Sequence, residues 1–231
     1  MKIPIIYEDE NVLVVDKPED LLVHPTGNSK PEIQNPKLTL IDYFPSVKPV
    51  HRLDRDTSGL LVLAKNKKTY NWLKNQFKNR KIKKKYIALV HGKLKDKKGI
   101  IVKSISRSKR KGRIQTVAPI GKMREAITRY KVIKEFNDYS LLEVFPETGR
   151  THQIRVHLAS IGHPIAGDKQ YKFKRQTTPK GLKRQFLHAN YLKFNLPDGK
   201  TVKFESKLPK DLNNILKKIQ ETRNKDTNNN Q

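Results

Sequence analysis

The sequence contains no cysteine among its 231 residues. This absence excludes disulfides, zinc sites built on thiolates and enzymes that use a cysteine nucleophile. Long apolar runs are missing too, since none approaches the roughly 20 residues that a membrane-spanning helix needs. The N-terminal segment turns acidic after six residues, which is unlike a signal peptide. We therefore expect a soluble, cytoplasmic protein.

Acidic residues are scarce, with 22 Asp and Glu against 50 Lys and Arg, for a formal net charge of +28. So large an excess repels itself, and a polyanionic partner is the simplest way to neutralise it. Nucleic acid is the leading candidate and an anionic membrane surface is the second. The second is disfavoured because the sequence lacks a strongly amphipathic basic helix with bulky aromatic anchors. A compositionally biased genome accounts for scattered lysines but less well for clusters.

Short β-branched and apolar runs outnumber helical patterns along the chain. We expect helices at 38–44, 66–77 and 151–161, the last capped by Thr151, and a long loop at 24–37. Most neighbouring strands are joined by turns, which favours an α+β fold with a largely antiparallel sheet. We expect one domain over residues 1–216 and a polar, disordered tail over 217–231. The expected strands are 3–7, 12–15, 60–64, 86–90, 126–136, 139–145, 185–195 and 200–205.

Residues 51–59, with the sequence HRLDRDTSG, place two carboxylates among cations. A nearby cation lowers the pKa of a carboxylate, and an ionised carboxylate beside a buried strand can act as a nucleophile or base. Asp54 and Asp56 are therefore candidates for chemistry. Spacing alone favours the alternative of a surface loop whose charges pair with each other, because Asp–Arg neighbours are common on surfaces.

Residues 145–157, with the sequence FPETGRTHQIRVH, join a glycine turn to a predicted helix. Backbone N–H groups at such a helix start suit phosphate, and Arg150, His152 and Arg155 gather there. Arg155 adjoins the apolar helix face, so we expect it to point partly inward and to need an anion, for which Asp54 is the natural candidate. The alternative is that its stem packs while its guanidinium reaches solvent.

A metal site on the nearby histidines is disfavoured. His152 and His157 are five residues apart rather than four, and no nearby carboxylate completes a ligand set with His163. We expect no metal.

A third stretch, residues 83–92 with the sequence KKKYIALVHG, places Tyr86 at the start of a strand, directly after lysines. A tyrosine in that position can stack on a base or handle a proton. Taken by itself, however, the stretch favours an ordinary core tyrosine.

Together the three stretches closely resemble the RluA-type RNA pseudouridine synthases. HRLD and TSG in 51–59 match that family's catalytic motif, KKYIA at 84–88 its tyrosine strand, and GRTHQIRVH at 149–157 with GHPIAGD at 162–168 its arginine helix. FLHA at 186–189 and EDENVLVVDKP at 8–18 fit as well. The resemblance implies the α+β pseudouridine synthase fold, a largely antiparallel mixed sheet flanked by helices, with the active-site cleft across the sheet. We expect the catalytic domain without the small S4 domain that some relatives carry in front.

The resemblance also implies roles. Asp54 is expected to be the essential carboxylate, Arg155 to pair with it and hold it ionised, and Tyr86 to stack on the target uracil. Arg52 would fill the gap left when the uridine flips out of its stack. The expected substrate-binding residues are His51, Arg52, Arg150 and Leu187.

The implied reaction breaks the N1–C1′ bond of a uridine, turns the uracil over and forms a C5–C1′ bond. No atoms are gained or lost, so no cofactor is expected. The carboxylate attacks the sugar or the base, or abstracts a sugar proton, and the sequence does not choose among these routes.

If the substrate is RNA, we expect three basic clusters to contact its phosphates and to position the folded RNA. Residues 78–85 hold six basic residues in eight, and residues 107–113 hold five in seven. The alternative is that each run is only a solvated face. The third cluster comprises Lys172, Lys174, Arg175, Lys180, Lys183 and Arg184. We expect contacts with the RNA backbone at Lys83, Lys84, Lys85, Arg107, Arg110 and Arg113.

The expected partner is ribosomal RNA, transfer RNA or both, bound by a monomer. The competing hypothesis is a non-catalytic RNA-binding or ribosome-assembly protein that kept the fold. A retired active site would be expected to lose one of Asp54, Tyr86 and Arg155, and all three are present.

Overall fold

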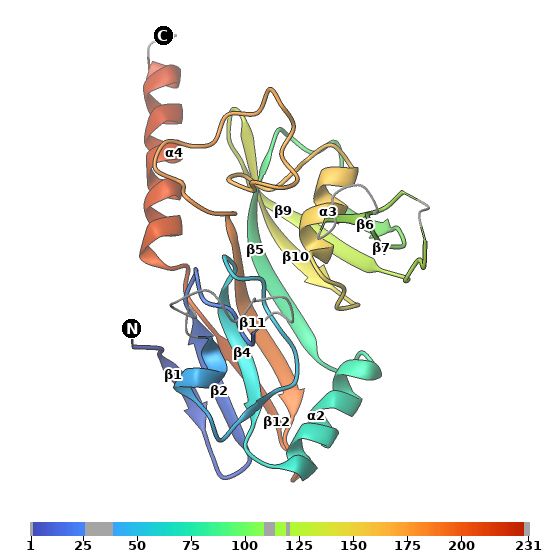
Figure 1. Cartoon of the computed structure of the whole chain (residues 1–231). Coiled ribbons are helices and arrows are strands. Elements are labelled where there is room, and N and C mark those ends of the chain that lie inside the picture. Colours follow the sequence, from blue (N-terminus) through green and yellow to red (C-terminus); the bar gives the residue numbers. More distant parts are fainter. Residues whose placement is uncertain (1, 26–38, 109–113, 119–120, 229–231) are drawn as a thin grey trace, which may run out of the picture. The chain divides into compact units, whose positions relative to one another are not determined.

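A computed structural model describes residues 2–25, 39–108, 114–118 and 121–228. The chain divides into two compact units (Figure 1). Unit 1 comprises Met1–Lys83 and Ala189–Ser206, and unit 2 comprises Lys84–His188 and Lys207–Gln231. The single domain predicted for residues 1–216 therefore contains two units, because the chain leaves unit 1 at Lys83 and returns to it within a strand.

Unit 1 is built on a sheet in which the strands follow the order β1-β2-β4-β11, with β12 beside β11 and β3 beside β4. The pairs β1–β2, β2–β4, β11–β12 and β3–β4 are antiparallel. Two short helices complete it, α1 (Leu40–Tyr43) and α2 (Lys67–Lys78). The strands are β1 (Ile5–Glu8), β2 (Val12–Lys17), β3 (Lys48–Pro49), β4 (Ser58–Ala64), β11 (Leu187–Asn195) and β12 (Thr201–Glu205).

The sequence patterns explain these elements. Every residue of β4 is buried, as its unbroken apolar run predicts. Helix α2 begins where the Asn66 side chain accepts the Thr69 N–H at 2.9 Å, and it buries Leu73 while Tyr70 and Phe77 pack partly against the same core. The predicted hairpin of β11 and β12 is confirmed, with Asn195 opposite Thr201.

Gly59 lies where two strands of unit 1 approach each other closely. Its φ is +117°, and a Cβ there would lie 2.6 Å from the Ala189 backbone N and overlap the carbonyl beside it. Only glycine combines that backbone conformation with so close a neighbour. The glycine of the HRLDRDTSG stretch is therefore required for packing rather than chemistry.

Gly59→Ala is expected to destabilise the protein by more than about 2 kcal/mol, because the backbone of Ala189 has little room to move. Gly199→Ala is the matched control, since Gly199 also has positive φ, +89°, but faces open space; it should cost about 1 kcal/mol. Urea unfolding at neutral pH measures both. Equal losses would show that the close approach to Ala189 carries no cost.

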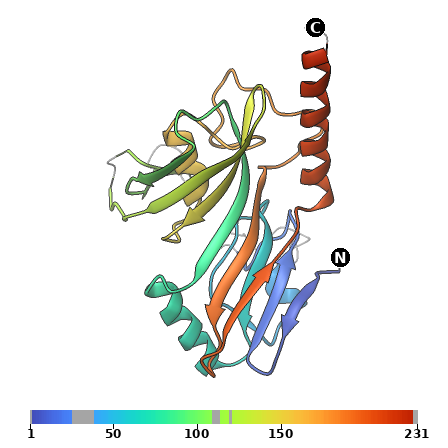
Figure 2. The same cartoon turned by 180° about the vertical axis from the view of Figure 1, so that it is seen from behind.

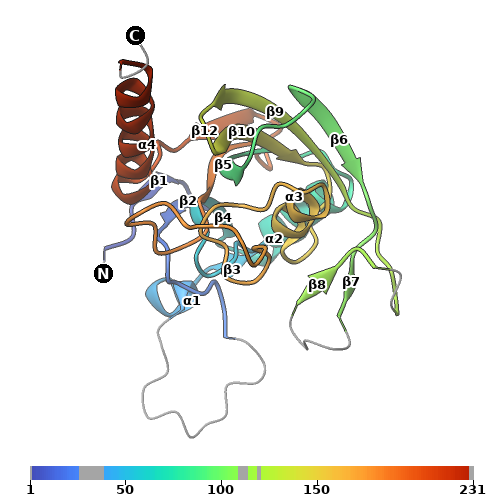
Figure 3. The ribbon, with the colours of Figure 1, turned by 90° about the horizontal axis from the view of Figure 1, so that it is seen from above.

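Unit 2 contains a second antiparallel sheet segment in the order β5-β10-β9-β6. Helix α3 (Gln153–Ser160) lies against it, and the strands stand in front of this helix when seen from behind (Figure 2). A small hairpin of β7 (Ser106–Arg107) and β8 (Gln115–Thr116) forms a separate sheet beside α3 (Figure 3). The larger strands are β5 (Lys83–His91), β6 (Lys98–Val102), β9 (Ile127–Glu135) and β10 (Tyr139–Pro146).

Two segments of unit 2 differ from their predictions. The weakly patterned basic region after Gly92 forms β6 and β7, because pairing with β9 and β8 supplies the order that its own pattern lacks. Helix α4 (Lys210–Asn228) extends beyond residue 217, where a disordered tail was expected. Its apolar residues repeat at helical spacing and pack on the unit 2 core; they are Leu212, Ile215, Leu216 and Ile219.

Helix α3 also begins differently from the prediction. His152 rather than Thr151 precedes the helix, in a left-handed conformation with φ 54°, and its side chain does not cap it. Instead, the buried Gln153 side chain accepts the Arg150 N–H at 3.0 Å. The predicted end is confirmed, since Gly162 has φ +90° and the His163 N–H reaches back to the Leu158 carbonyl at 3.0 Å.

Candidate functional site

The HRLDRDTSG stretch forms a tight loop that leads into β4. Asp54 is half-buried, and its carbonyl accepts the Thr57 N–H at 3.1 Å. Arg55 is paired through its Nε with Asp20 at 2.6 Å, and lies 4.0 Å from Asp56. The ion pairs of Arg55 with Asp20 and Asp56 are of the kind that the surface-loop alternative expects.

Lys17 contacts this loop, and the sequence did not reveal its role. It is fully buried at the end of β2, and its Nζ donates to the carbonyls of Pro18 at 2.7 Å, Leu21 at 2.8 Å and Arg55 at 3.0 Å. A buried ammonium needs such hydrogen-bond acceptors, and one of the three is the carbonyl of Arg55, the residue directly after Asp54. Lys17 therefore anchors the loop that carries Asp54.

His51 and Arg52 begin the same loop. The His51 Nε2 accepts the Val62 N–H of β4 at 3.1 Å, and its ring packs against Phe77 at 4.6 Å between centroids. These contacts give His51 a structural task within unit 1, and its predicted contact with substrate stays a prediction. Arg52 is exposed, as the predicted gap-filling role requires.

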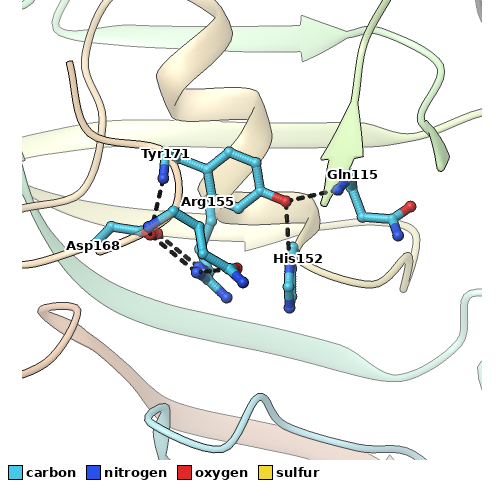
Figure 4. Close-up of polar contacts among 6 residues, drawn as sticks. Gln115, His152, Arg155, Asp168 and Tyr171 are labelled. Atoms are coloured by element: carbon cyan, nitrogen blue, oxygen red, sulfur yellow. Dashed lines mark hydrogen bonds and ion pairs between the residues drawn. The ribbon is translucent and has the colours of Figure 1, made fainter. Parts of the chain in front are cut away.

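In unit 2, Arg155 points inward from α3 and is only 5% exposed. Its Nε donates to Asp168 Oδ2 at 2.6 Å, and its Nη2 donates to Asp168 Oδ1 at 2.9 Å and to Gln170 Oε1 at 2.9 Å (Figure 4). The ring of Tyr171 lies 5.1 Å from its Cζ. The alternative in which the Arg155 guanidinium reaches solvent is therefore wrong.

The predicted need of Arg155 for an anion is confirmed, and Asp168 supplies one. Asp168 is fully buried and also accepts the N–H groups of Gln170 at 2.9 Å and Tyr171 at 3.2 Å. A two-point ion pair satisfied in this way holds the guanidinium in one orientation. Pairing of Arg155 with Asp54 would join residues of different units, and it stays a prediction.

A chain of buried hydrogen bonds fixes the inner face of α3 on β9. The Gln153 amide donates to Thr128 Oγ1 at 3.0 Å, the Thr128 hydroxyl bonds His157 Nδ1 at 2.9 Å, and His157 Nε2 bonds the Lys103 carbonyl at 2.9 Å. Burial lowers the pKa of His157, which favours the neutral ring that this series of hydrogen bonds requires.

The histidines considered as metal ligands form hydrogen bonds with different groups of the protein. His163 Nδ1 bonds the His91 carbonyl at 2.8 Å, while His157 serves the network just described. Among the described residues, no three His, Asp or Glu side chains gather as metal ligands would. Within the same residues, no helix is both long and apolar enough to cross a membrane.

The three lysines before Tyr86 differ in exposure and in their partners. Lys83 is exposed, whereas Lys84 donates to the Thr148 carbonyl at 3.3 Å, and burial lowers its pKa to about 8. Lys85 pairs with Glu143 of β10 at 3.0 Å. Groups of unit 2 therefore hold Lys84 and Lys85, and the predicted phosphate contact rests mainly on Lys83. Tyr86 follows on β5, half-buried, opposite Val144.

The other predicted RNA contacts vary in exposure. Arg107 is exposed on β7, while Arg110 and Arg113 lie outside the described residues. Arg150 is half-buried, and its Nε donates to the Glu125 carbonyl at 3.0 Å. Leu187 is buried in the unit 2 core.

Within the third basic cluster, one assignment is wrong. Arg184 is buried and pairs with Asp211 of α4 at 2.8 Å, so it fastens the C-terminal helix rather than facing RNA. The rest of the cluster is exposed, namely Lys172, Lys174, Arg175, Lys180 and Lys183.

Comparisons with known proteins agree on one family. The family model for RNA pseudouridylate synthase matches residues 11–160. The chain is 40% identical over 227 residues to an uncharacterized RNA pseudouridine synthase of Bacillus subtilis, covering 95% of this chain and 73% of that protein. It is 39% identical over 227 residues to ribosomal large subunit pseudouridine synthase D of Buchnera aphidicola, covering 92% and 71%.

Solved structures confirm the predicted fold. Human RNA pseudouridylate synthase domain containing 4 superposes with a TM-score of 0.76 at 26% identity, over 94% of this chain and 92% of that one. Human RNA pseudouridylate synthase domain containing 1 gives a TM-score of 0.74 at 29% identity, over 90% and 84%. The sequence matches and these structural likenesses converge, and the chain belongs to the RNA pseudouridylate synthase family.

Proposed function

We propose that this enzyme isomerises specific uridines of large-subunit ribosomal RNA to pseudouridine, with Asp54 as the essential carboxylate. The observation that carries the proposal is the family match over residues 11–160, which contains the unbroken HRLDRDTSG stretch. The choice of RNA rests on relatives of 35–40% identity named ribosomal large subunit pseudouridine synthase D. Transfer RNA is the second candidate substrate.

The catalytic roles are assigned by the family motif and are consistent with each residue's surroundings. Asp54 attacks the sugar or base of the flipped uridine, or removes a sugar proton. Tyr86 stacks on the uracil and confines it while it turns over. Arg155, held rigidly by Asp168, keeps Asp54 ionised through its positive charge. Arg52 stacks in the space that the uridine vacates.

The strong positive charge supports an RNA substrate. With +28 formal charges, the protein attracts phosphates along its surface, and Lys83 and Arg107 are exposed members of the basic clusters at 78–85 and 107–113. A non-catalytic RNA-binding protein would share this charge. Support for the enzyme comes from the presence of Asp54, Tyr86 and Arg155 together, because a retired active site would be expected to lose one of them.

The proposal is tested by incubating the purified protein with transcripts of large-subunit ribosomal RNA and of transfer RNAs. Pseudouridine is detected by carbodiimide adducts that stop reverse transcription. We expect stops at one or a few uridines of the ribosomal transcript. Stops only in transfer RNA would overturn the choice of substrate, and no stops in either RNA would overturn the catalytic assignment.

A further inference from the structure

We propose that Tyr171 is a positioning residue with two separable tasks. Its ring holds the Arg155 guanidinium in place, and its hydroxyl ties the β7–β8 hairpin to the start of α3 through His152. The proposal rests on the function proposed above, because it assigns these tasks to turnover and to RNA binding. The three side chains and Gln115 are seen together in Figure 4.

The ring of Tyr171 closes one side of the Arg155 site. The Arg155 Cζ lies 5.1 Å from the ring centroid, while Asp168 and Gln170 take the Nε and Nη2 hydrogens. A guanidinium over an aromatic face is attracted to it, and more strongly when both are shielded from water. The Tyr171 N–H also donates to Asp168 Oδ1, so one residue supports both members of the ion pair.

The hydroxyl of Tyr171 joins two segments that are far apart in sequence. It accepts the Gln115 N–H of β8 at 3.0 Å and lies 3.0 Å from His152 Nδ1. Donation of the hydroxyl proton to Nδ1 requires the His152 tautomer that carries its own proton on Nε2. The two rings meet edge to face, with centroids 5.8 Å apart.

His152 needs such support because its backbone is strained. Its φ of 54° is uncommon for a residue other than glycine, and it stands directly before α3. Arg155 follows three residues later in the first turn of that helix. The bond from Tyr171 therefore links the hairpin to the strained residue from which the helix of Arg155 begins.

The hairpin is the part of this network that RNA would reach. Arg107 on β7 is exposed and pairs in register with Gln115, whose N–H binds the Tyr171 hydroxyl. Phosphate contacts at this hairpin would therefore be supported by Tyr171. Loss of the hydroxyl should weaken RNA binding, whereas loss of the ring should slow the chemical step as well.

The first experiment compares turnover of Tyr171→Phe and Tyr171→Met with the wild type. Phenylalanine keeps the ring and removes the hydroxyl, so we expect KM to rise about fivefold, the worth of one hydrogen bond, with kcat little changed. Methionine removes the aromatic face too, so kcat should fall by a further tenfold or so. Equal kcat in the two variants would overturn the task of the ring, and an unchanged KM in Tyr171→Phe would overturn that of the hydroxyl.

The second experiment does not depend on activity. The 15N NMR spectrum of the protein without RNA, labelled at its histidine ring nitrogens, should show His152 as the Nε2–H tautomer. The His152 signal is identified by its loss in His152→Gln. In Tyr171→Phe, which preserves the shape of the side chain, the Nδ1 shift should move toward that of a solvent-bonded ring. An unchanged His152 signal would overturn the link.

The two failures are distinguishable. If the wild type makes no pseudouridine but the His152 signal responds to Tyr171→Phe, the proposed function fails while the Tyr171–His152 link stands. If Tyr171→Met does not fold, Tyr171→Leu takes its place, and the Arg155 Nε–H resonance reports on the ring. That resonance should move in Tyr171→Leu and stay in Tyr171→Phe, and an unmoved resonance in Tyr171→Leu would overturn the task of the ring.

Discussion

Asp54→Asn should abolish pseudouridine formation while leaving RNA binding nearly intact. The amide has the size and hydrogen-bonding reach of the carboxylate but neither attacks carbon nor accepts a proton at neutral pH. Removal of an essential nucleophile or base typically lowers kcat by about 10³-fold or more. Single-turnover assays on the ribosomal transcript measure the loss, and filter binding measures affinity for the same RNA.

Asp56→Asn is the matched control for this substitution. Asp56 lies two residues away in the same loop, is half-buried like Asp54, and is 4.0 Å from the exposed Arg55. Exposed pairs of this kind contribute little, so the variant should keep most of its activity. Comparable activity in the two variants would contradict the assignment of Asp54.

Asp168→Ala should have the largest effect on stability, a loss of about 3–5 kcal/mol, because it leaves the guanidinium of Arg155 buried without its carboxylate. The N–H groups of Gln170 and Tyr171 also lose their acceptor. Urea unfolding at neutral pH measures the change. Activity should fall as well, since Arg155 would no longer be held in one orientation.

Asp211→Ala provides the comparison, because Asp211 also pairs with a buried arginine, Arg184, but its own side chain is 43% exposed. Water can reach that site, so we expect a smaller loss, about 1–2 kcal/mol. In the double variant Arg155→Met/Asp168→Leu, stability should recover toward wild type because no charge is left buried. Activity should not recover. A double variant with normal turnover would show that this pair serves the fold alone.

Local patterns in the sequence were enough for most elements of the fold. Apolar alternation and turn residues predicted β1 with β2, β9 with β10 and β11 with β12, because a hairpin is specified by residues close together in the chain. The elements that the sequence did not predict depend on partners outside their own segments; they are β3, β6, β7, β8 and the part of α4 beyond residue 217. Their patterns are weak without the surfaces on which they pack.

The chemistry that this chain can perform was likewise readable from its sequence. The HRLDRDTSG stretch, Tyr86 and Arg155 carry the resemblance to the pseudouridine synthases, and the family match agrees with it. The amino acids needed for catalysis are few, and their types and spacing persist in a motif. Spacing alone did not separate Asp54 from Asp56; the motif assigns the catalytic role to Asp54, and that assignment stays a prediction.

The partners of these residues came only from the tertiary structure. Arg155 meets Asp168, Lys17 reaches the carbonyl of Arg55, 38 positions along the chain, and the Tyr171 hydroxyl meets Gln115, 56 positions away. Burial likewise separates Lys83, which faces solvent, from Lys84 and Lys85, which unit 2 holds. A sequence specifies which groups are present, but distance and exposure to water determine which of them pair, and those arise only when distant segments pack together.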